Sequence, residues 1–245
     1  MGKKGVNMLL FYVRHGDPIY TPDSLTPFGE RQAEAVGKML RNFRIDEVFA
    51  STSERAKLTA TPLCEISKKE MTLLDFANEI YAWRELTCYS KAIETNTWLF
   101  CAPEMKELFH TPEMISLGQH WYEHPAFKGE EFEGKDYGAG IKRIQAGADE
   151  FIASLGYKRV SDGKYEVVKH SGKRVALFAH QGFGLSFLSC LVGIPYPMFC
   201  THFDICTSGV TVIEFNNEGG YSYPRILTLS SAAHLYKEGL PTRYN

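Results

Sequence analysis

Residues 9–18 decide the fold, and they read Leu-Leu-Phe-Tyr-Val-Arg-His-Gly-Asp-Pro. The apolar run from Met8 to Val13 predicts a strand that is buried on both faces of a parallel sheet. The run ends at Arg14-His15-Gly16, so a guanidinium and an imidazole stand at the carboxyl end of the strand. Open α/β sheets bind their ligands at that edge, which makes these two side chains candidates for a binding or catalytic site.

The length, charge and cysteine content of the chain exclude several classes of protein. Its 245 residues, 44% of them hydrophobic, suffice for one α/β domain with an insertion or for two small domains. The formal net charge of −2 favours neither a nucleic-acid partner nor a membrane surface, so an anionic ligand would need cations gathered at one place. The six cysteines form no Cys-x-x-Cys pair and several stand in apolar runs, which indicates reduced core thiols in a cytoplasmic protein.

Strand and helix patterns alternate along the chain in the manner of an α/β protein. Thr26 and Pro27 are residue types that begin a helix. Ser53 is expected to cap the next helix, which Pro62 should kink or shorten. Besides the first strand, we predict strands over residues 46–50, 71–76, 174–179, 209–215 and 225–230, and helices over residues 141–155 and 185–192.

Residues 86–173 differ from the rest of the chain because they are rich in Trp, Tyr, Phe, His and Pro. Within them, residues 130–140 are polar and rich in glycine, which predicts a loop. We interpret the whole region as an insertion that covers the functional edge of the sheet as a lid. The chain is therefore expected to form a single domain over residues 1–245, with its core in residues 8–85 and 174–235.

Polar side chains follow the ends of several predicted strands. Arg14 and His15, Arg55, Glu79 and His180 each come shortly after such an end, and in a mostly parallel sheet these ends converge on one edge. The planar guanidinium of arginine matches the geometry of phosphate oxygens, and the N-termini of the following helices add unpaired N–H groups. The sequence therefore predicts an anion site at this edge.

Four segments of the chain resemble the signatures of one known family. The first is the strand that ends in Arg14-His15-Gly16, and the second, residues 25–33, reads Leu-Thr-Pro-Phe-Gly-Glu-Arg-Gln-Ala. The third, residues 51–60, has the pattern Ser-x-x-x-Arg-Ala-x-x-Thr-Ala, and the fourth, residues 177–182, reads Leu-Phe-Ala-His-Gln-Gly. Their order and spacing are similar to those of the histidine phosphatase superfamily, also called phosphoglycerate mutase-like.

This resemblance implies a three-layer α/β/α sandwich with a mostly parallel central sheet and an activity on phosphoesters. His15 would be the nucleophile that takes the phosphoryl group as a phosphohistidine, and an acceptor, usually a backbone carbonyl, would fix its tautomer. Arg14, Arg55 and His180 would hold the transferring oxygens and offset the developing charge.

The resemblance also implies a carboxylic acid that protonates the leaving oxygen and then activates water against the phosphohistidine. The family places this acid just after the third strand, where Glu79 is the best match. The usual Gly-x-x-Glu-Gly continuation is absent, and Glu85 is the second candidate. Further phosphate contacts are expected from the backbone of Gln181 and Gly182 and from Thr21 or Tyr20.

The sequence departs from the mutases of the family, which hold a doubly phosphorylated cofactor with additional cations. Where the mutases carry Arg-His-Gly-x-Ser-x-Trp-Asn, residues 14–21 read Arg-His-Gly-Asp-Pro-Ile-Tyr-Thr, and paired arginines are not visible in the insertion. We therefore predict a phosphomonoester hydrolase that needs no cofactor, acts on a small phosphorylated substrate and releases inorganic phosphate. A phosphoglycerate mutase-type phosphotransferase and a non-catalytic phospholigand-binding protein are the alternatives, and the oligomeric state is open.

Two groups of potential metal ligands are interpreted as structural. His120 and His124 stand four residues apart, but no acidic third ligand accompanies them in a typical pattern. Cys200, His202 and Cys206 are interleaved with apolar residues, which indicates core or pocket wall. We predict no metal site.

Overall fold

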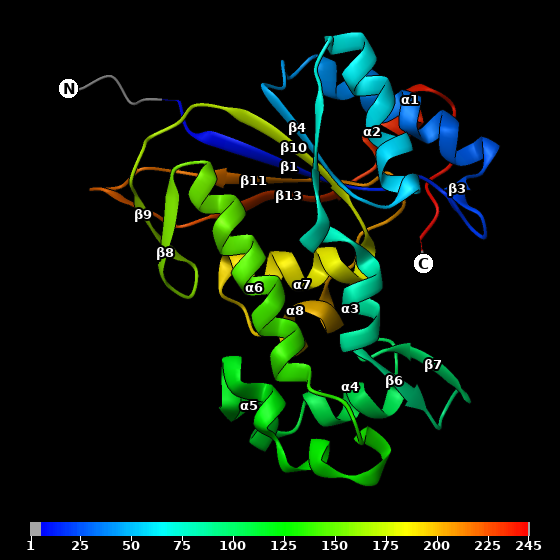
Figure 1. Ribbon diagram of the computed structural model, residues 1–245, viewed down its shortest axis with the longest axis vertical. Helices are drawn as coiled ribbons and strands as arrows, with labels where there is room; N and C mark the ends of the chain where they lie inside the picture. The colour runs from blue at the N-terminus through cyan, green and yellow to red at the C-terminus, as the bar shows by residue number, and fades with distance from the viewer. Residues whose placement is uncertain (1–5, 245) are drawn as a thin grey trace.

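The computed structural model describes residues 6–244, so residues 1–5 and 245 of the predicted domain lie outside the described range. A six-stranded sheet forms the centre, in the order β13-β11-β1-β10-β4-β5 (Figure 1). In this sheet β11 runs antiparallel to its neighbours β1 and β13, and the other neighbouring pairs are parallel. The predicted α/β class with a mostly parallel sheet is therefore confirmed. The strands are β1 (Met8–Arg14), β4 (Glu47–Ser51), β5 (Met71–Leu74), β10 (Arg174–Ala179), β11 (Val210–Phe215) and β13 (Arg225–Ser231).

Helices cover both faces of this sheet. On one face lie α1 (Pro27–Arg41) and α2 (Glu54–Ser67), and on the other lie α6 (Tyr137–Ser154) and α7 (Gln181–Val192) (Figure 1). Phe11 and Val13 of β1 belong to the apolar core on the α1 and α2 side, whereas Leu10 and Tyr12 belong to the larger core that contains α6 and α7. Because successive side chains of a strand point to opposite faces, β1 is buried on both, as its apolar run predicts. The three-layer sandwich is confirmed.

Residues 86–173 form several small elements and one long helix, α6. Their aromatic side chains contribute largely to the core: Trp121 is 1% exposed, stacks on Tyr196 at 5.2 Å between ring centroids, and meets Phe109 edge-on. A lid over the sheet edge is therefore not confirmed, and the division into core and insertion stays a prediction. The other elements of this region are β6 (Thr87–Ser90), β7 (Thr95–Trp98), α4 (Pro103–Phe109), α5 (Pro112–Leu117), β8 (Tyr157–Ser161), β9 (Lys164–Val167) and 3₁₀ turns at Gly118–Glu123, Pro125–Lys128 and Glu130–Phe132.

The prediction of a loop over residues 130–140 is wrong in its second half, because α6 begins at Tyr137. Asp136 caps the helix by accepting a hydrogen bond from Ala139 N. Two glycines permit close packing here: a Cβ at Gly138 would lie 2.7 Å from Tyr122, and one at Gly140 would lie 2.7 Å from Glu85. Tertiary contacts thus outweigh the low helix propensity of glycine.

Two other local predictions are corrected around α2 and β5. Of the two effects predicted for Pro62, shortening of α2 is wrong, because the helix continues to Ser67 and packs closely against α1 at Gly37, and a kink stays a prediction. The predicted strand over residues 71–76 ends at Leu74 and is followed by a 3₁₀ turn, Asp75–Ala77. The Asp75 carboxylate accepts hydrogen bonds from the side chains of Thr52 and Tyr81, which favours a turn over a continued strand.

The remaining elements were not predicted. They are the hairpin β2 (Pro18–Tyr20) and β3 (Asp23–Leu25), α3 (Glu79–Glu85), α8 (Tyr196–His202), β12 (Tyr221–Ser222) and α9 (Ala233–Lys237). Within the described range, none of the helices has the length and apolar character needed to cross a bilayer. The expectation of reduced thiols agrees with six free cysteines, although Cys101 is exposed rather than buried in the core.

Candidate active site

His15 follows β1 directly, and its ring is 1% exposed. Its Nδ1 lies 2.7 Å from the carbonyl oxygen of Gly16. A carbonyl can only accept, so Nδ1 carries the proton and Nε2 presents its lone pair. Burial, together with the charges of Arg14 and Arg55, holds the pKa of His15 well below its usual value and keeps the imidazole neutral.

The turn after His15 is held in place by the two helices of the same face. Gly16 N donates to Thr59 Oγ1 of α2 at 3.0 Å, and Asp17 N donates to Gln32 Oε1 of α1 at 2.8 Å. The N-terminus of α1 approaches so closely that a Cβ at Gly29 would lie 2.2 Å from the Asp17 carbonyl oxygen. The second and third signature segments thus have a physical role, because they fix the backbone that carries His15.

His180 follows β10, the parallel neighbour of β1, and its ring meets that of His15 edge-on at 5.2 Å between centroids. Its Nε2 lies 2.8 Å from Ser51 Oγ and 3.2 Å from Ser53 Oγ. Ser53 is therefore used for His180 and makes no side-chain cap of α2, contrary to expectation. Burial and the nearby cationic groups lower the pKa of His180 well below its usual value.

Two arginines flank the histidines. Arg14 is buried, and its Nη1 donates to the carbonyl of Ile205 at 2.7 Å. Arg55, in the first turn of α2, donates from Nη1 to Asp23 Oδ1 at 2.7 Å and from Nη2 to Glu79 Oε2 at 3.4 Å. Asp23 also accepts from Glu54 N, so this carboxylate both orients Arg55 and caps α2.

His15, His180, Arg14 and Arg55 together form a group that we call the cage. Glu79 begins α3, and its carboxylate reaches this cage. Oε1 accepts from Gly182 N at 2.8 Å, and Oε2 lies 3.6 Å from His180 Nδ1. The side chain is 14% exposed. Burial raises the pKa of Glu79, and the charges of Arg55 and Arg14 oppose that rise.

Glu85, the second candidate for the acid, lies at the opposite end of α3. Its carboxylate forms an ion pair with Arg143 of α6, with Nε to Oε1 at 2.7 Å. Arg143 also donates to the Phe76 carbonyl, so this cation is committed to packing α6 against α3. Glu79 and not Glu85 therefore shares the cage with His15 and His180.

The additional phosphate contacts predicted from the sequence lie at the margin of this cage. The Gln181 side chain donates to Asp204 Oδ1 at 2.5 Å, and the Gly182 N–H is directed to Glu79. Thr21 is exposed in the turn between β2 and β3, while its neighbours Tyr20 and Asp23 line a cavity next to the cage.

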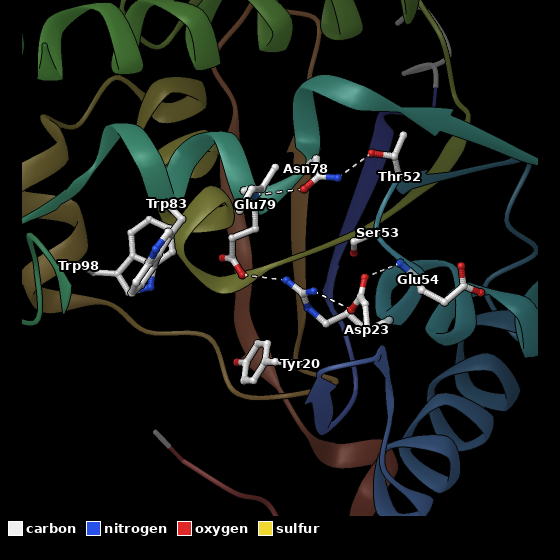
Figure 2. A pocket seen from close by; sticks show the side chains of 11 residues that line it. Tyr20, Asp23, Thr52, Ser53, Glu54, Asn78, Glu79, Trp83 and Trp98 are labelled. Carbon is white, nitrogen blue, oxygen red and sulfur yellow. Dashed lines mark hydrogen bonds and ion pairs between the residues drawn. The ribbon is translucent and has the colours of Figure 1, made fainter. Parts of the chain in front are cut away.

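This cavity has a volume of about 740 Å³, within the usual range for small-molecule sites. Arg55 is one of the lining residues. Glu79 lies in the middle of the cavity, Trp83 and Trp98 form one end, and Glu54 lies toward the other (Figure 2). The Tyr20 ring lies 5.4 Å from the Arg55 guanidinium carbon. The remaining lining residues are Asp23, Thr52, Ser53, Asn78 and Ile80.

Three of the side chains at this site are of types that bind metal ions. Within the described range, the group of three that could hold an ion is His15, Glu79 and His180, whose ligand atoms lie within 4.8 Å of one another. The two arginines beside these atoms disfavour a dication and favour an anion. The histidines and cysteines discussed above as potential metal ligands have other partners. Cys206 hydrogen bonds with Ser230, His202 with His110, and His120 with Glu123.

The chain resembles known proteins in sequence and in fold. The sequence model described as histidine phosphatase superfamily (branch 1) matches residues 10–97. The resemblance to this superfamily is confirmed. That match contains Arg14, His15, Arg55 and Glu79, and the fourth signature segment lies beyond it. No curated protein gives a significant sequence match.

Solved structures of similar fold cover nearly the whole chain. A phosphoserine phosphatase from Entamoeba histolytica has a TM-score of 0.59 at 16% identity, covering 93% of this chain and 99% of its own. A mycobacterial glucosyl-3-phosphoglycerate phosphatase has 0.58 at 15%, covering 91% and 98%. The α-ribazole phosphatase from Shigella flexneri has 0.57 at 18%, covering 91% and 96%. At these identities the likeness establishes the fold.

Several residues of the site were missed in the sequence. Asp23 lies in a short hairpin without a recognisable motif. Its partner Arg55 is 32 residues away in the sequence, so no local pattern marks the pair. Ser51 belongs to a signature segment, yet nothing local indicates that its hydroxyl meets His180. Tyr12 was interpreted only as an apolar strand residue, although its hydroxyl donates to the carbonyl and accepts from the N–H of His180.

Proposed function

We propose that the protein is a phosphomonoester hydrolase that transfers the phosphoryl group of a small substrate to His15 and then to water. The observation that carries the proposal is the fixed tautomer of His15, whose Nδ1 is committed to the Gly16 carbonyl beside two arginines. This leaves a neutral Nε2 as the nucleophile. The phosphatases of similar fold support the same reaction class.

Each neighbouring group has a role in the proposed reaction. Arg14, Arg55 and His180 bind the transferring oxygens and offset the charge that develops on them. Arg55 Nε and His180 Nδ1 support this role, because both atoms are buried and make no hydrogen bond within the described range. Glu79, with its raised pKa, donates a proton to the leaving oxygen, and its carboxylate then activates the water that attacks the phosphohistidine.

The charge of the cavity favours hydrolysis over a mutase reaction. Among the described residues that line it, Arg55 is the single cation, against the carboxylates of Asp23, Glu54 and Glu79. A doubly phosphorylated cofactor would need a second group of cations. The non-catalytic alternative is less favoured because binding alone would need neither the neutral Nε2 of His15 nor the raised pKa of Glu79.

The test is turnover together with trapping of the intermediate. His15→Ala should reduce p-nitrophenyl phosphate hydrolysis by at least a thousandfold, while the matched exposed-histidine variant His120→Ala should hydrolyse it like the wild type. Rapid acid-free quenching and mass spectrometry should find phosphate on the peptide that contains His15, stable in alkali and labile in acid. Retained turnover in His15→Ala would exclude the proposed nucleophile, and phosphate binding without turnover in the wild type would favour the binding protein.

A further inference from the structure

Two tryptophans form an aromatic wall at one end of the cavity, next to the proposed acid. Trp83 lies on α3 four residues after Glu79, and Trp98 ends β7. Their rings meet at 87° with centroids 5.1 Å apart, and both line the cavity (Figure 2). Trp83 is 38% exposed, although an aromatic side chain of this size is usually more deeply buried.

Trp98 is held rigidly in this position. On one side it stacks on Phe100, with ring planes 12° apart. On another it rests on the first turn of α7, where a Cβ at Gly182 would lie 2.3 Å from the indole ring. Because Gly182 N also binds the Glu79 carboxylate, the indole lies directly beside the group proposed to protonate the leaving oxygen.

The charges around this wall restrict what can bind there. Arg55 is already paired with Asp23 and Glu79, and it is the single cation among the described lining residues. A carboxylate or a second phosphate on the substrate would therefore meet apolar rings and no counter-ion. A planar ring without negative charge would instead gain stacking and apolar burial.

We propose that the substrate is a phosphomonoester whose alcohol part carries a planar aromatic ring without negative charge, and that Trp98 and Trp83 bind this ring. The proposal rests on the proposed function, since it names the substrate class of the same site. The phosphoryl group lies toward His15, and the ring extends from the leaving oxygen along the wall. Trp98 supplies the fixed surface, and Trp83 closes it from the side.

The experiment uses alkyl phosphates whose leaving oxygens are chemically alike: benzyl, cyclohexylmethyl, 4-carboxybenzyl and ethyl phosphate. We expect kcat/KM to be about tenfold higher for benzyl than for cyclohexylmethyl phosphate, and at least tenfold higher than for 4-carboxybenzyl phosphate. Trp98→Leu should lower kcat/KM for benzyl phosphate about ten times more than kcat/KM for ethyl phosphate, which has no ring for the indole to contact. Trp98→Phe should keep most of the preference, because it retains a ring.

A control on the same hairpin separates recognition from folding. Tyr89 lies on β6, is exposed and does not line the cavity, so Tyr89→Leu should change none of the four rates. Equal rates for benzyl, cyclohexylmethyl and 4-carboxybenzyl phosphate would overturn the inference while the proposed hydrolase stands. An equal loss on benzyl and ethyl phosphate in Trp98→Leu would do the same, because it would mean general damage to the site. If none of the four phosphates is hydrolysed, the proposed hydrolase function itself is contradicted.

Discussion

The surroundings of His15 and Glu79 shift the pKa values of these two side chains in opposite directions. Burial and two guanidinium groups lower the pKa of His15, so the proposed nucleophile stays neutral well into the acidic range. Burial raises the pKa of Glu79, so its acid form persists to higher pH than for an exposed carboxyl. A neutral base and a protonated acid can therefore coexist at mildly acidic pH.

The raised pKa of Glu79 predicts that substitution of Glu79 and of Glu85, which lie on the same helix, affects hydrolysis differently. Glu79→Gln should slow ethyl phosphate hydrolysis by about a hundredfold or more and p-nitrophenyl phosphate hydrolysis far less, because p-nitrophenolate leaves without a proton. In the wild type the rate should fall on the basic side, as Glu79 loses its proton above its raised pKa, and Glu79→Gln should lose this limb. Steady-state rates from pH 4 to 9 measure both effects. Glu85→Gln is the control, and a leaving-group dependence in that variant instead would show that the acid is Glu85.

At the scale of elements, the site depends on how closely α1 approaches the turn after β1. Gly29 and Gly16 face each other, and a Cβ at Gly16 would lie 2.6 Å from the Gly29 carbonyl oxygen. Neither glycine has a positive φ, so it is the close approach and not the backbone conformation that requires glycine at both positions.

Gly29→Ala tests this packing against simple helix propensity. Propensity alone would stabilise α1, since alanine is the better helix former by about 1 kcal/mol. We expect the reverse, a loss of about 1–3 kcal/mol in the free energy of unfolding together with reduced hydrolysis, because the new Cβ would meet the Asp17 carbonyl. Urea unfolding and kcat measurements check this. Gly129→Ala is the matched control, since its Cβ meets nothing closer than 3.4 Å, and a gain of stability in Gly29→Ala would refute the argument.

The elements that could be predicted from the sequence are those with a local signal, and the ones that were missed depend on tertiary contacts. Arg14 and His15 were found because their strand is marked by its own apolar run, and Thr26 because helix starts have a local signal. The start of α6 was missed because its glycines suggest a loop until the packing of Tyr122 and Glu85 is known. Asp23 was missed for a related reason, since only the folded chain brings it to Arg55.

For the whole molecule, buried neutral histidines link stability to pH. His15, His180 and His234 are all buried with lowered pKa values, and burial lowers the pKa of His234 to about 4. The unfolded chain takes up these protons near pH 6.5, whereas the folded chain resists them. Stability is therefore full above pH 6.5 and falls as the pH drops below it. Glu79, with its raised pKa, acts in the opposite direction but is a single group.

His234 allows this effect to be measured away from the cage residues. It is 5% exposed, and its Nε2 lies 2.7 Å from Ser208 Oγ. Between pH 7 and 5, His234 should account for a loss of about 2 kcal/mol in the free energy of unfolding, because the slope approaches about 1.4 kcal/mol per pH unit below pH 6.5. His234→Gln should lose this part of the slope in urea unfolding at pH 7, 6 and 5. Parallel curves for the variant and the wild type would contradict the assignment.

The hairpin of β6 and β7 has a consequence for how such an enzyme could be redirected. The groups proposed for chemistry come from the central sheet and from α2, α3 and α7, whereas Trp98 arrives on a separate two-stranded ribbon. Because Trp98 is proposed to bind the alcohol part of the substrate, we expect exchange of that ribbon to alter which alcohol is accepted without rebuilding the proposed reaction centre. Such a graft would have to keep the packing of Trp98 on Gly182, because the N–H of the same glycine donates to Glu79, the proposed acid.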